Sequence, residues 1–432
     1  MSDWSLAIDF GTCFTTAAVR VAQAGPVVAV EIENSRYLPS LVCLDDAGAL
    51  LTGRAAVQLA AQRPERAELG PKRALLRQRA VLLDGREVAT VDLVAAVLAR
   101  AAAEARAQNG GGAPARTVLT HPADWSPADL GRLVEAAVRA GIDDPELLAE
   151  PVAAARFHAA AAALGADAGE AGHADGSAPY EDRPIAVYDL GGGTVDIAVL
   201  RREGGGFRAV AVAGNPDFGG RDLDQALFEL LRDRALDVDP APWYRLWPDP
   251  ASAAAPASDS ADASDASDAA TAHQRFQLAR ELTLAKESLS STGTVYLAVP
   301  GYRDPFVVQG GEYRAAVTPA LTASVELLER ALARAGVSPE DLAAVVLCGA
   351  AGRTPVVADL IAARLGRLPE LAADPKAVVA LGALTDPPAS PGPADGAGGA
   401  HDGADAGQSA KRWAVTHYPD EDDPRLDGRR PL

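Results

Sequence analysis

Short apolar runs alternate along this chain with longer stretches rich in Ala, Leu, Arg and Glu. The short runs predict buried strands and the longer stretches predict helices, because a strand needs only about four to eight apolar residues and a helix more than about ten. Strands are expected over residues 6–10, 17–21, 117–120, 185–190, 195–200 and 344–348, and helices over residues 91–107, 126–140 and 355–365. Because strands and helices alternate throughout, the pattern predicts an α/β fold.

Two of the predicted strand pairs enclose a glycine-containing turn that follows an aspartate, in Asp9-Phe-Gly-Thr12 and in Asp189-Leu-Gly-Gly-Gly-Thr194. Such a turn exposes backbone N–H groups with no Cβ in the way, a geometry that binds phosphate oxygens. The aspartate is placed to hold Mg²⁺ through its water shell. Ordinary hairpins, whose glycines serve only the turn geometry, are the alternative. The repetition favours phosphate binding and predicts two related lobes that face one another.

Changes in composition divide the chain. We expect lobe I over residues 1–164, a loop insertion rich in Gly, Ala and Asp over 165–184, lobe II over 185–366, a helix returning to lobe I over 367–385, and a disordered tail over 386–432. Within lobe II, residues about 249–275 form an Ala-Ser-Asp tract without apolar periodicity, and such a tract buries too little surface to offset its ordering entropy. We therefore expect a disordered insertion there.

The charge balance and the cysteines exclude several classes of protein. The 40 basic and 59 acidic residues give a formal net charge of −19, and nucleic-acid binding requires a basic surface, so no nucleic-acid partner is expected. The amino terminus lacks a signal pattern and no run approaches the ~20 apolar residues of a membrane span, so we expect a cytoplasmic protein without membrane insertion. Three scattered cysteines predict neither a disulfide framework nor a zinc site.

Lysine is scarce in this chain, and its positions are therefore informative. Lys72, Lys286, Lys376 and Lys411 are the four lysines among the 40 basic residues. Arginine and lysine differ in shape, hydration and donor geometry, so a retained lysine indicates a position where arginine would not serve.

The chain contains neither a Gly-x-x-x-x-Gly-Lys-[Ser/Thr] motif nor a Gly-x-Gly-x-x-Gly motif after a strand, which excludes P-loop and Rossmann nucleotide binders. Residues 5–385 instead resemble the nucleotide-binding domain of heat shock protein 70 (DnaK-type) chaperones, in the actin-like ATPase superfamily. The segments that carry the resemblance stand in the family's order: Ile8–Thr12, Ala149–Ala155, Val187–Asp196, Gly219–Asp224, Ala285–Ser290, Val346–Pro355 and Ala377–Ala383. The resemblance implies the actin-like ATPase fold, which is ribonuclease H-like, with two lobes around a nucleotide cleft.

The resemblance also implies ATP and Mg²⁺ as ligands, with K⁺ as a further cation, and assigns roles to residues. Asp9 and Asp189 would hold hydrated Mg²⁺. The catalytic set would be Lys72, Glu150, Asp189, Thr194 and Asp196. The nucleotide-binding set would be Gly11, Thr12, Cys13, Phe14, Gly191, Gly192, Gly193, Thr194, Gly219, Gly220, Thr283, Lys286, Ser290, Gly349, Ala350, Ala351, Gly352 and Arg353.

Lys72 falls where the family's catalytic lysine reaches the γ-phosphate and the attacking water. A solvated surface lysine is the alternative for Lys72. Because two of only four lysines, Lys72 and Lys286, fall on nucleotide positions of the family, the sequence favours the catalytic role.

Several positions depart from the family pattern at the nucleoside end. Cys13 and Phe14 replace a usual threonine and tyrosine, and Thr283 replaces a glutamate near the ribose. Ala350 stands at a family glycine, where a Cβ is expected to cost about 1 kcal/mol in a glycine-type conformation. Glu287 replaces an arginine that stacks on adenine opposite the residue matched by Arg353, so we expect weakened adenine affinity.

The expected activity is slow MgATP hydrolysis that drives a lobe rotation read by a protein partner. Glu146 replaces an arginine that the family offers to J-domain co-chaperones, so a standard J-domain partner is not expected. We expect no peptide-binding domain after residue 385. An ATP-gated scaffold with negligible hydrolysis is the alternative. A sugar or acyl kinase of the same superfamily lacks an evident acceptor segment.

Overall fold

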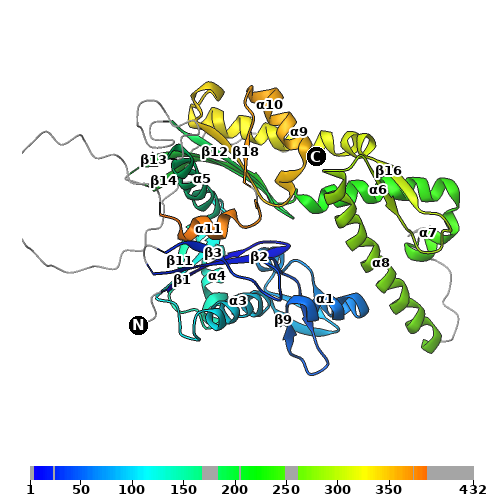
Figure 1. Cartoon of the computed structure of the whole chain (residues 1–432). Coiled ribbons are helices and arrows are strands. Elements are labelled where there is room, and N and C mark those ends of the chain that lie inside the picture. Colours follow the sequence, from blue (N-terminus) through cyan, green and yellow to red (C-terminus); the bar gives the residue numbers. More distant parts are fainter. Residues whose placement is uncertain are drawn as a thin grey trace, which may run out of the picture. The chain divides into compact units, whose positions relative to one another are not determined.

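The computed structural model describes residues 4–22, 25–167, 183–203, 206–248, 261–372 and 374–386. Two large sheets, which Figure 1 shows in the body of the fold, share one strand order. The first sheet runs β11 (Glu146–Ala149), β10 (Arg116–His121), β1 (Trp4–Phe10), β2 (Phe14–Val21) and β3 (Val27–Ala29), with β4 (Leu38–Pro39) also paired to β2. The second runs β18 (Glu370–Leu371), β17 (Ala344–Cys348), β12 (Ile185–Leu190), β13 (Val195–Glu203) and β14 (Gly206–Asn215).

In each sheet the first three strands are parallel, and the last two pair antiparallel to their neighbours. The hairpins β1–β2 and β12–β13 therefore occupy equivalent places. This equivalence confirms, at the level of topology, the internal duplication that the two glycine-containing turns predict.

Helices cover both faces of each sheet. Helices α3 (Thr90–Gln108) and α4 (Pro127–Arg139) share a core with one face of the first sheet, and α9 (Gly310–Ala335) and α10 (Pro355–Leu365) share one with a face of the second. Helices α5 (Glu150–Asp167) and α11 (Val378–Leu384) lie between the sheets (Figure 1): α11 packs against Ala7 and Ala18, and α5 packs against Val187.

The alternation of side chains along the strands decides which residues face this middle layer. On β1, Phe10 packs toward α3 while Ala7 packs toward α11. Successive strand residues point to opposite faces, so Asp9 shares the face of Ala7. The same alternation on β12 and β13 places Asp189 and Asp196 on the face that packs against α5. The middle layer thus collects aspartates from both sheets.

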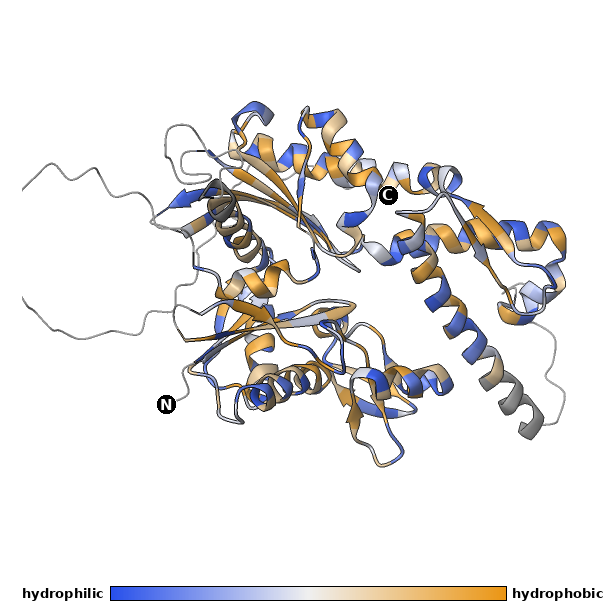
Figure 2. Cartoon of the chain, viewed as in Figure 1, coloured by the Kyte–Doolittle hydropathy of each residue, from blue (hydrophilic) through white to orange (hydrophobic). Residues whose placement is uncertain are grey.

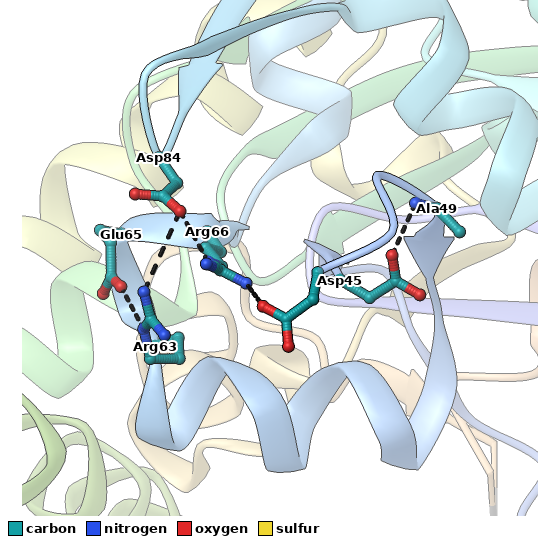
Figure 3. A network of polar contacts seen from close by, with 7 residues as sticks. Asp45, Ala49, Arg63, Glu65, Arg66 and Asp84 are labelled. Atoms are coloured by element: carbon teal, nitrogen blue, oxygen red, sulfur yellow. Dashed lines mark hydrogen bonds and ion pairs between the residues drawn. The ribbon is translucent and has the colours of Figure 1, made fainter.

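Short elements link the first hairpin to α3. They are β5 (Val42–Leu44), β6 (Leu50–Leu51), α1 (Gly53–Gln62), η1 (Pro64–Arg66), β7 (Ala67–Glu68), α2 (Pro71–Arg77), β8 (Ala80–Leu83) and β9 (Arg86–Ala89). A partly exposed ion network joins them (Figure 3): Arg66 bonds Asp84 at 2.8 Å, and Arg63 bonds Glu65 at 2.6 Å. Asp84 lies in the β8–β9 turn, so the network ties this turn to η1, just before α2.

A helical extension belongs to the second sheet. It comprises α6 (Gly220–Val238), α7 (Pro240–Leu246), α8 (Ala261–Leu289), β15 (Thr294–Leu297) and β16 (Phe306–Gln309), and the single turns η2 (Pro339–Asp341) and η3 (Ala351–Arg353) follow. The extension shares one apolar core with α9 and the second sheet. Figure 2 shows hydrophobic residues concentrated along the strands of both sheets. None of the described helices combines the length and the apolar content needed to cross a bilayer.

The predicted strands and helices are confirmed, with ends shifted by a few residues, and the mixed α/β class is confirmed. The disorder expected over 249–275 is wrong for 261–275, because α8 begins at Ala261. Alanine is the strongest helix former, and the tract continues directly into core residues such as Leu278 and Leu282. Residues 249–260 lie outside the described part of the chain.

Three predicted boundaries also differ from the structure. Helix α5 extends to Asp167, beyond the predicted end of lobe I, and strand β18 joins the second sheet beyond residue 366. The returning helix occupies only Val378–Leu384 of the predicted 367–385. Most of the predicted loop insertion, and the predicted tail except Asp386, lie outside the described residues. The division into two lobes stays a prediction.

Gly382 sets the distance between α11 and α5. A Cβ on Gly382 would lie 1.9 Å from the carbonyl oxygen of Ala153, whereas a Cβ on Gly131 of α4 would meet nothing within 4 Å. We expect Gly382→Ala to lower the free energy of unfolding by about 2–3 kcal/mol, because the helices must separate. Gly131→Ala should raise it by roughly 0.5–1 kcal/mol, because alanine is the better helix former. Urea denaturation of both variants measures the difference, and equal effects would contradict the close helix approach.

Candidate functional site

Four carboxylates gather where the two sheets face the middle layer. Asp9 and Asp189 precede the last residues of β1 and β12, Asp196 is the second residue of β13, and Glu150 opens α5. Asp189 and Asp196 are cross-strand partners. The charge of Glu150 acts on the pKa of all three aspartates, which places the four groups within electrostatic reach of one another. The structure thus brings together the carboxylates to which the sequence assigns metal-binding and catalytic roles.

Lys72 supplies positive charge to this cluster. Its Nζ lies 2.8 Å from Glu150 Oε1, and the two residues are only 7% and 6% exposed. The ammonium also lies 5.5 Å from the centroid of the Trp125 ring. The interpretation of Lys72 as a solvated surface lysine is therefore excluded. Removing either member of a buried pair leaves an uncompensated charge, so the two residues depend on each other.

Burial and like-charge repulsion shift the pKa values of the cluster. Desolvation, reinforced by the charge of Glu150, raises the pKa of Asp9 and of Asp196 to about 7. The same causes raise the pKa of Asp189 well above its usual range. Burial lowers the pKa of Lys72, but attraction by Glu150 and Asp9 outweighs it, so its pKa is raised. The cluster holds more carboxylate than Lys72 alone neutralises.

The first predicted phosphate turn is held through its carbonyl groups. The amide of Ser40 donates to Cys13 O at 2.9 Å, and Ser40 Oγ donates to Gly11 O at 2.8 Å. Ser40 is fully buried. Ser40, which lies outside the hairpin, therefore fixes the turn by bonding its carbonyl oxygens rather than its amide N–H groups.

The second turn is anchored in the same way by the start of α6. Gly191 O accepts from the amide of Gly220, and Gly192 O accepts from the amide of Arg221, each at 2.9 Å. These bonds place the Gly219–Asp224 segment directly against the second turn.

The amide donors of both turns remain available. Among the residues that the structure describes, the amides of Thr12, Cys13, Gly192, Gly193 and Thr194 donate to no protein acceptor. Consecutive amides of this kind form a concave site for anions. Phosphate binding at both turns is therefore chemically possible, and it stays a prediction.

The two turns also pack against each other. A Cβ on Gly192 would lie 2.3 Å from Cys13 Sγ, and a Cβ on Gly193 would lie 2.8 Å from Thr12 Cγ2. A Cβ on Gly219 would lie 2.6 Å from the backbone of Gly193. The glycines are required here because turns from both sheets and the start of α6 meet backbone to backbone.

The motif assigned to adenosine turns at Gly349, where φ is +74°. A Cβ there would lie 2.3 Å from Leu190 O and 2.4 Å from Asp189 Oδ1, so only glycine fits. The strain expected at Ala350 is wrong, because Ala350 has φ −62° and ψ −40°, an ordinary right-handed conformation. The backbone reverses at Gly349 and enters η3 at once, so Ala350 and Ala351 need no left-handed conformation.

Of the residues assigned to the nucleoside, Lys286 and Thr283 reach the start of α6, which packs against the second turn, and Ser290 does not. Lys286 Nζ lies 2.8 Å from both Gly220 O and Asp224 Oδ1. Thr283 Oγ1 donates to Asp224 Oδ2 at 3.2 Å. Ser290 instead lines a cavity of about 260 Å³ together with residues of α9 and α10.

Phe14 and Glu287 meet at Lys376. The ammonium of Lys376 lies 3.3 Å from Glu287 Oε1, and 5.0 and 5.1 Å from the ring centroids of Phe14 and Tyr37. Burial raises the pKa of Tyr37 to about 12, while the nearby charge of Arg353 acts to lower it. The arginine that the family places at position 287 is absent, but a lysine from another segment lies beside Glu287.

The sequence did not identify Ser40, Arg73, Trp125, Asp224 or Lys376 as site residues. Two of these residues could have been found from the sequence. Lys376 is one of the four scarce lysines, and Arg73 directly follows Lys72. Ser40 and Trp125 had no such signal, because only the fold brings them to the turn and to Lys72.

The carboxylate cluster suits a hydrated cation. The described part of the chain holds no group of three or more His, Cys, Asp or Glu side chains arranged for direct metal ligation. The excess of Asp9, Asp189, Asp196 and Glu150 over Lys72 favours a divalent cation held through its water shell. The assignment of Mg²⁺ to Asp9 and Asp189 stays a prediction.

Comparison with known proteins gives a consistent result. A family model described as Hsp70 protein matches residues 77–237 and 258–387. The chain is 30% identical over 407 residues to a chaperone protein HscA homolog of Acidithiobacillus ferrooxidans, an alignment that covers 88% of this chain and 57% of the relative. It is 31% identical over 408 residues to the HscA homolog of Azotobacter vinelandii, covering 88% of this chain and 56% of the relative. The chain thus spans just over half the length of these curated relatives.

Asp196→Asn tests the effect of the carboxylate cluster on stability. An aspartate in an unfolded chain has a pKa near about 3.9, whereas that of Asp196 in the folded protein is about 7. The folded state binds this proton more tightly, so its contribution to stability is present below pH ~4 and is lost as the pH rises through ~7. Asparagine keeps an acceptor for Thr194 Oγ1, which now donates to Asp196 at 2.7 Å. Without nucleotide, we expect the variant to be more stable than wild type at pH ~8 by roughly 1–2 kcal/mol.

Urea denaturation at about pH 5 and about pH 8 measures this effect. Asp237→Asn, at an exposed position of α6, is the matched control and should change stability by less than about 0.5 kcal/mol. An Asp196→Asn variant as pH-dependent as wild type would contradict the raised pKa.

Proposed function

The chain belongs to the Hsp70 family, and from this premise we propose that it binds MgATP between its two lobes and hydrolyses it slowly. The lobes are those predicted from the sequence, residues 1–164 and 185–366, with one phosphate turn in each. We further propose that the nucleotide state drives a rotation of the lobes and that a protein partner recognises the rotated state.

The observation that carries the proposal is the buried Lys72–Glu150 pair beside the two turns. A cavity of about 220 Å³ is lined by Lys72, by Thr12 of the first turn and by Thr194 of the second. A γ-phosphate held by the amides of both turns would therefore meet the ammonium of Lys72. Phosphoryl transfer depends mainly on positioning and on stabilisation of developing charge, and this arrangement supplies both.

In the proposed hydrolysis, the oxygen of a water molecule bonds to the γ-phosphorus while the bond to the bridging oxygen of ADP breaks. ADP keeps the bridging oxygen, and the released proton passes to phosphate or solvent. Lys72 stabilises charge on the γ-phosphoryl oxygens. Glu150 holds Lys72 in place, and Asp196 orients the hydroxyl of Thr194. Bound Mg²⁺, through waters held by Asp9 and Asp189, would neutralise phosphate charge.

Helices α5 and α11 provide the proposed route from nucleotide to partner. Glu150 opens α5 at the carboxylate cluster, and Gly382 of α11 lies against Ala153 of the same helix. Glu146, exposed on β11, bonds Arg116 at 2.7 Å, so this surface carries an ion pair where the family offers an arginine. We therefore infer that the partner is not a standard J-domain.

An ATP-gated scaffold with negligible hydrolysis remains the second candidate. The altered nucleoside end favours it, because Glu287 and Lys376 replace the stacking arginine and Ala351 lacks a hydroxyl. The buried Lys72–Glu150 pair favours hydrolysis, because binding alone does not need a lysine at that place.

Single-turnover release of γ-phosphate from ATP, with Mg²⁺ and K⁺, distinguishes the two candidates. We expect slow release by wild type and a loss of at least about 100-fold in Lys72→Ala and in Thr194→Ala, because each removes a group beside the transferred phosphoryl. Thr318→Ala, at a half-buried position of α9 that does not line the cavity, is the control and should behave as wild type. Tight ATP binding by wild type, with release no faster than in the two variants, would reject hydrolysis and leave the scaffold.

A further inference from the structure

We propose that the cavity of about 220 Å³ beside α2 binds inorganic phosphate after ATP cleavage and is its exit route, with Arg73 as the main ligand. The ligand class is a tetrahedral oxyanion. The inference rests on the proposed function, because the phosphate is the product of the hydrolysis proposed for the same site.

The cavity has the size and the lining for a small anion. A water molecule occupies about 30 Å³ of liquid volume, so about 220 Å³ holds an oxyanion with several waters. The lining carries cations and hydroxyls together with the apolar walls of Leu76, Pro122 and Trp125. Thr12 and Thr194 connect it to the two turns that are expected to hold the γ-phosphate before cleavage.

Arg73 is the cation of this lining whose charge is not neutralised. Lys72 is paired with Glu150, and Arg77 is paired with Asp217. Arg73 donates to the neutral carbonyl of Gly193, and within the described ranges it forms no ion pair. Its Nε is buried and has no hydrogen-bond partner there either. A guanidinium with unused donors is the preferred partner of a phosphate.

The position of Arg73 places it directly beside the second turn. A Cβ on Gly193 would lie 2.9 Å from Arg73 Nε and 3.0 Å from its Nη2, so the guanidinium lies against the glycine. A phosphate that leaves the turn amides can therefore be taken up by Arg73 without first entering bulk solvent. The bond to Gly193 O keeps the side chain in this place when no phosphate is bound.

The ion pair Arg77–Asp217 lies at the mouth of the cavity. Both residues line it, and their side chains are 61% and 66% exposed. Arg77 belongs to α2, and Asp217 lies between β14 and α6, so the pair joins segments of the two predicted lobes. Exposed ion pairs contribute little to stability, so this contact is easy to open. The pair is the gate of the proposed exit.

Titration of inorganic phosphate into the protein saturated with ADP and Mg²⁺, followed by calorimetry, tests the ligand. We expect Arg73→Gln, which keeps a donor for Gly193 O but loses the charge, to bind phosphate at least tenfold more weakly than wild type. Arg73→Lys should be intermediate, because it restores charge with fewer donors. Arg303→Ala, at an exposed position, is the control. Absence of phosphate binding by wild type, or unchanged affinity in Arg73→Gln, would overturn the proposal.

The gate is tested by measuring ATP cleavage and phosphate release separately in single turnovers. We expect Arg77→Ala and Asp217→Ala each to speed release severalfold without changing cleavage, and the double variant to add nothing further. Arg314→Ala is the matched control, because Arg314 and Asp359 form a pair 50% and 60% exposed between α9 and α10. Faster release in the control, or unchanged release in both gate variants, would overturn the gate.

The two proposals fail in distinguishable ways. If wild type does not cleave ATP, the proposed hydrolysis fails, and the phosphate titration still decides whether Arg73 binds the anion. If wild type cleaves ATP but phosphate affinity does not depend on Arg73, the cavity proposal fails while the hydrolysis stands.

Discussion

The candidate site depends on the buried ion pair between Lys72 and Glu150. Asp9, Asp189 and Asp196 lie within electrostatic reach of it, and burial raises the pKa of each. Such a cluster is unfavourable in the protein alone, because desolvated carboxylates repel one another. A hydrated divalent cation would supply the missing positive charge. The cluster is therefore suited to a cation, while the free amides of the two turns are suited to an anion.

The duplicated sheets explain how this cluster forms. Equivalent hairpins end at the middle layer, and strand alternation directs Asp9 and Asp189 to that layer from opposite sheets. The turns then meet backbone to backbone, and only glycine fits at positions 192 and 193. Their carbonyls are occupied by Ser40 and by the start of α6. The amides consequently remain for an anion, so one arrangement provides close packing and binding capacity together.

Much of the site could be predicted because its residues stand in short local motifs. The structure brings Lys72, Thr12 and Thr194 to one cavity and Lys286 to the start of α6, and the positive φ of the adenosine motif falls on Gly349; their roles toward a nucleotide stay predictions. Ala350 was misjudged, because a glycine in a motif does not reveal which residue takes the positive φ. The helix over 261–275 was missed, because an Ala-Ser-Asp tract has helix propensity but no apolar period, and its continuation into the core residues of α8 decided the outcome.

By itself, the sequence determined the alternation of strands and helices and the two aspartate-containing turns, since these depend on residues that are neighbours along the chain. It also determined the family, since short motifs follow one another in the family's order. Only the tertiary structure decided which charges compensate one another. Four contacts join segments that are distant along the chain: Trp125 with Lys72, Asp217 with Arg77, Lys376 with Glu287, and Arg73 with Gly193. Electrostatic and packing interactions act through space over a few ångströms, so no local pattern specifies these partners before the two sheets are assembled.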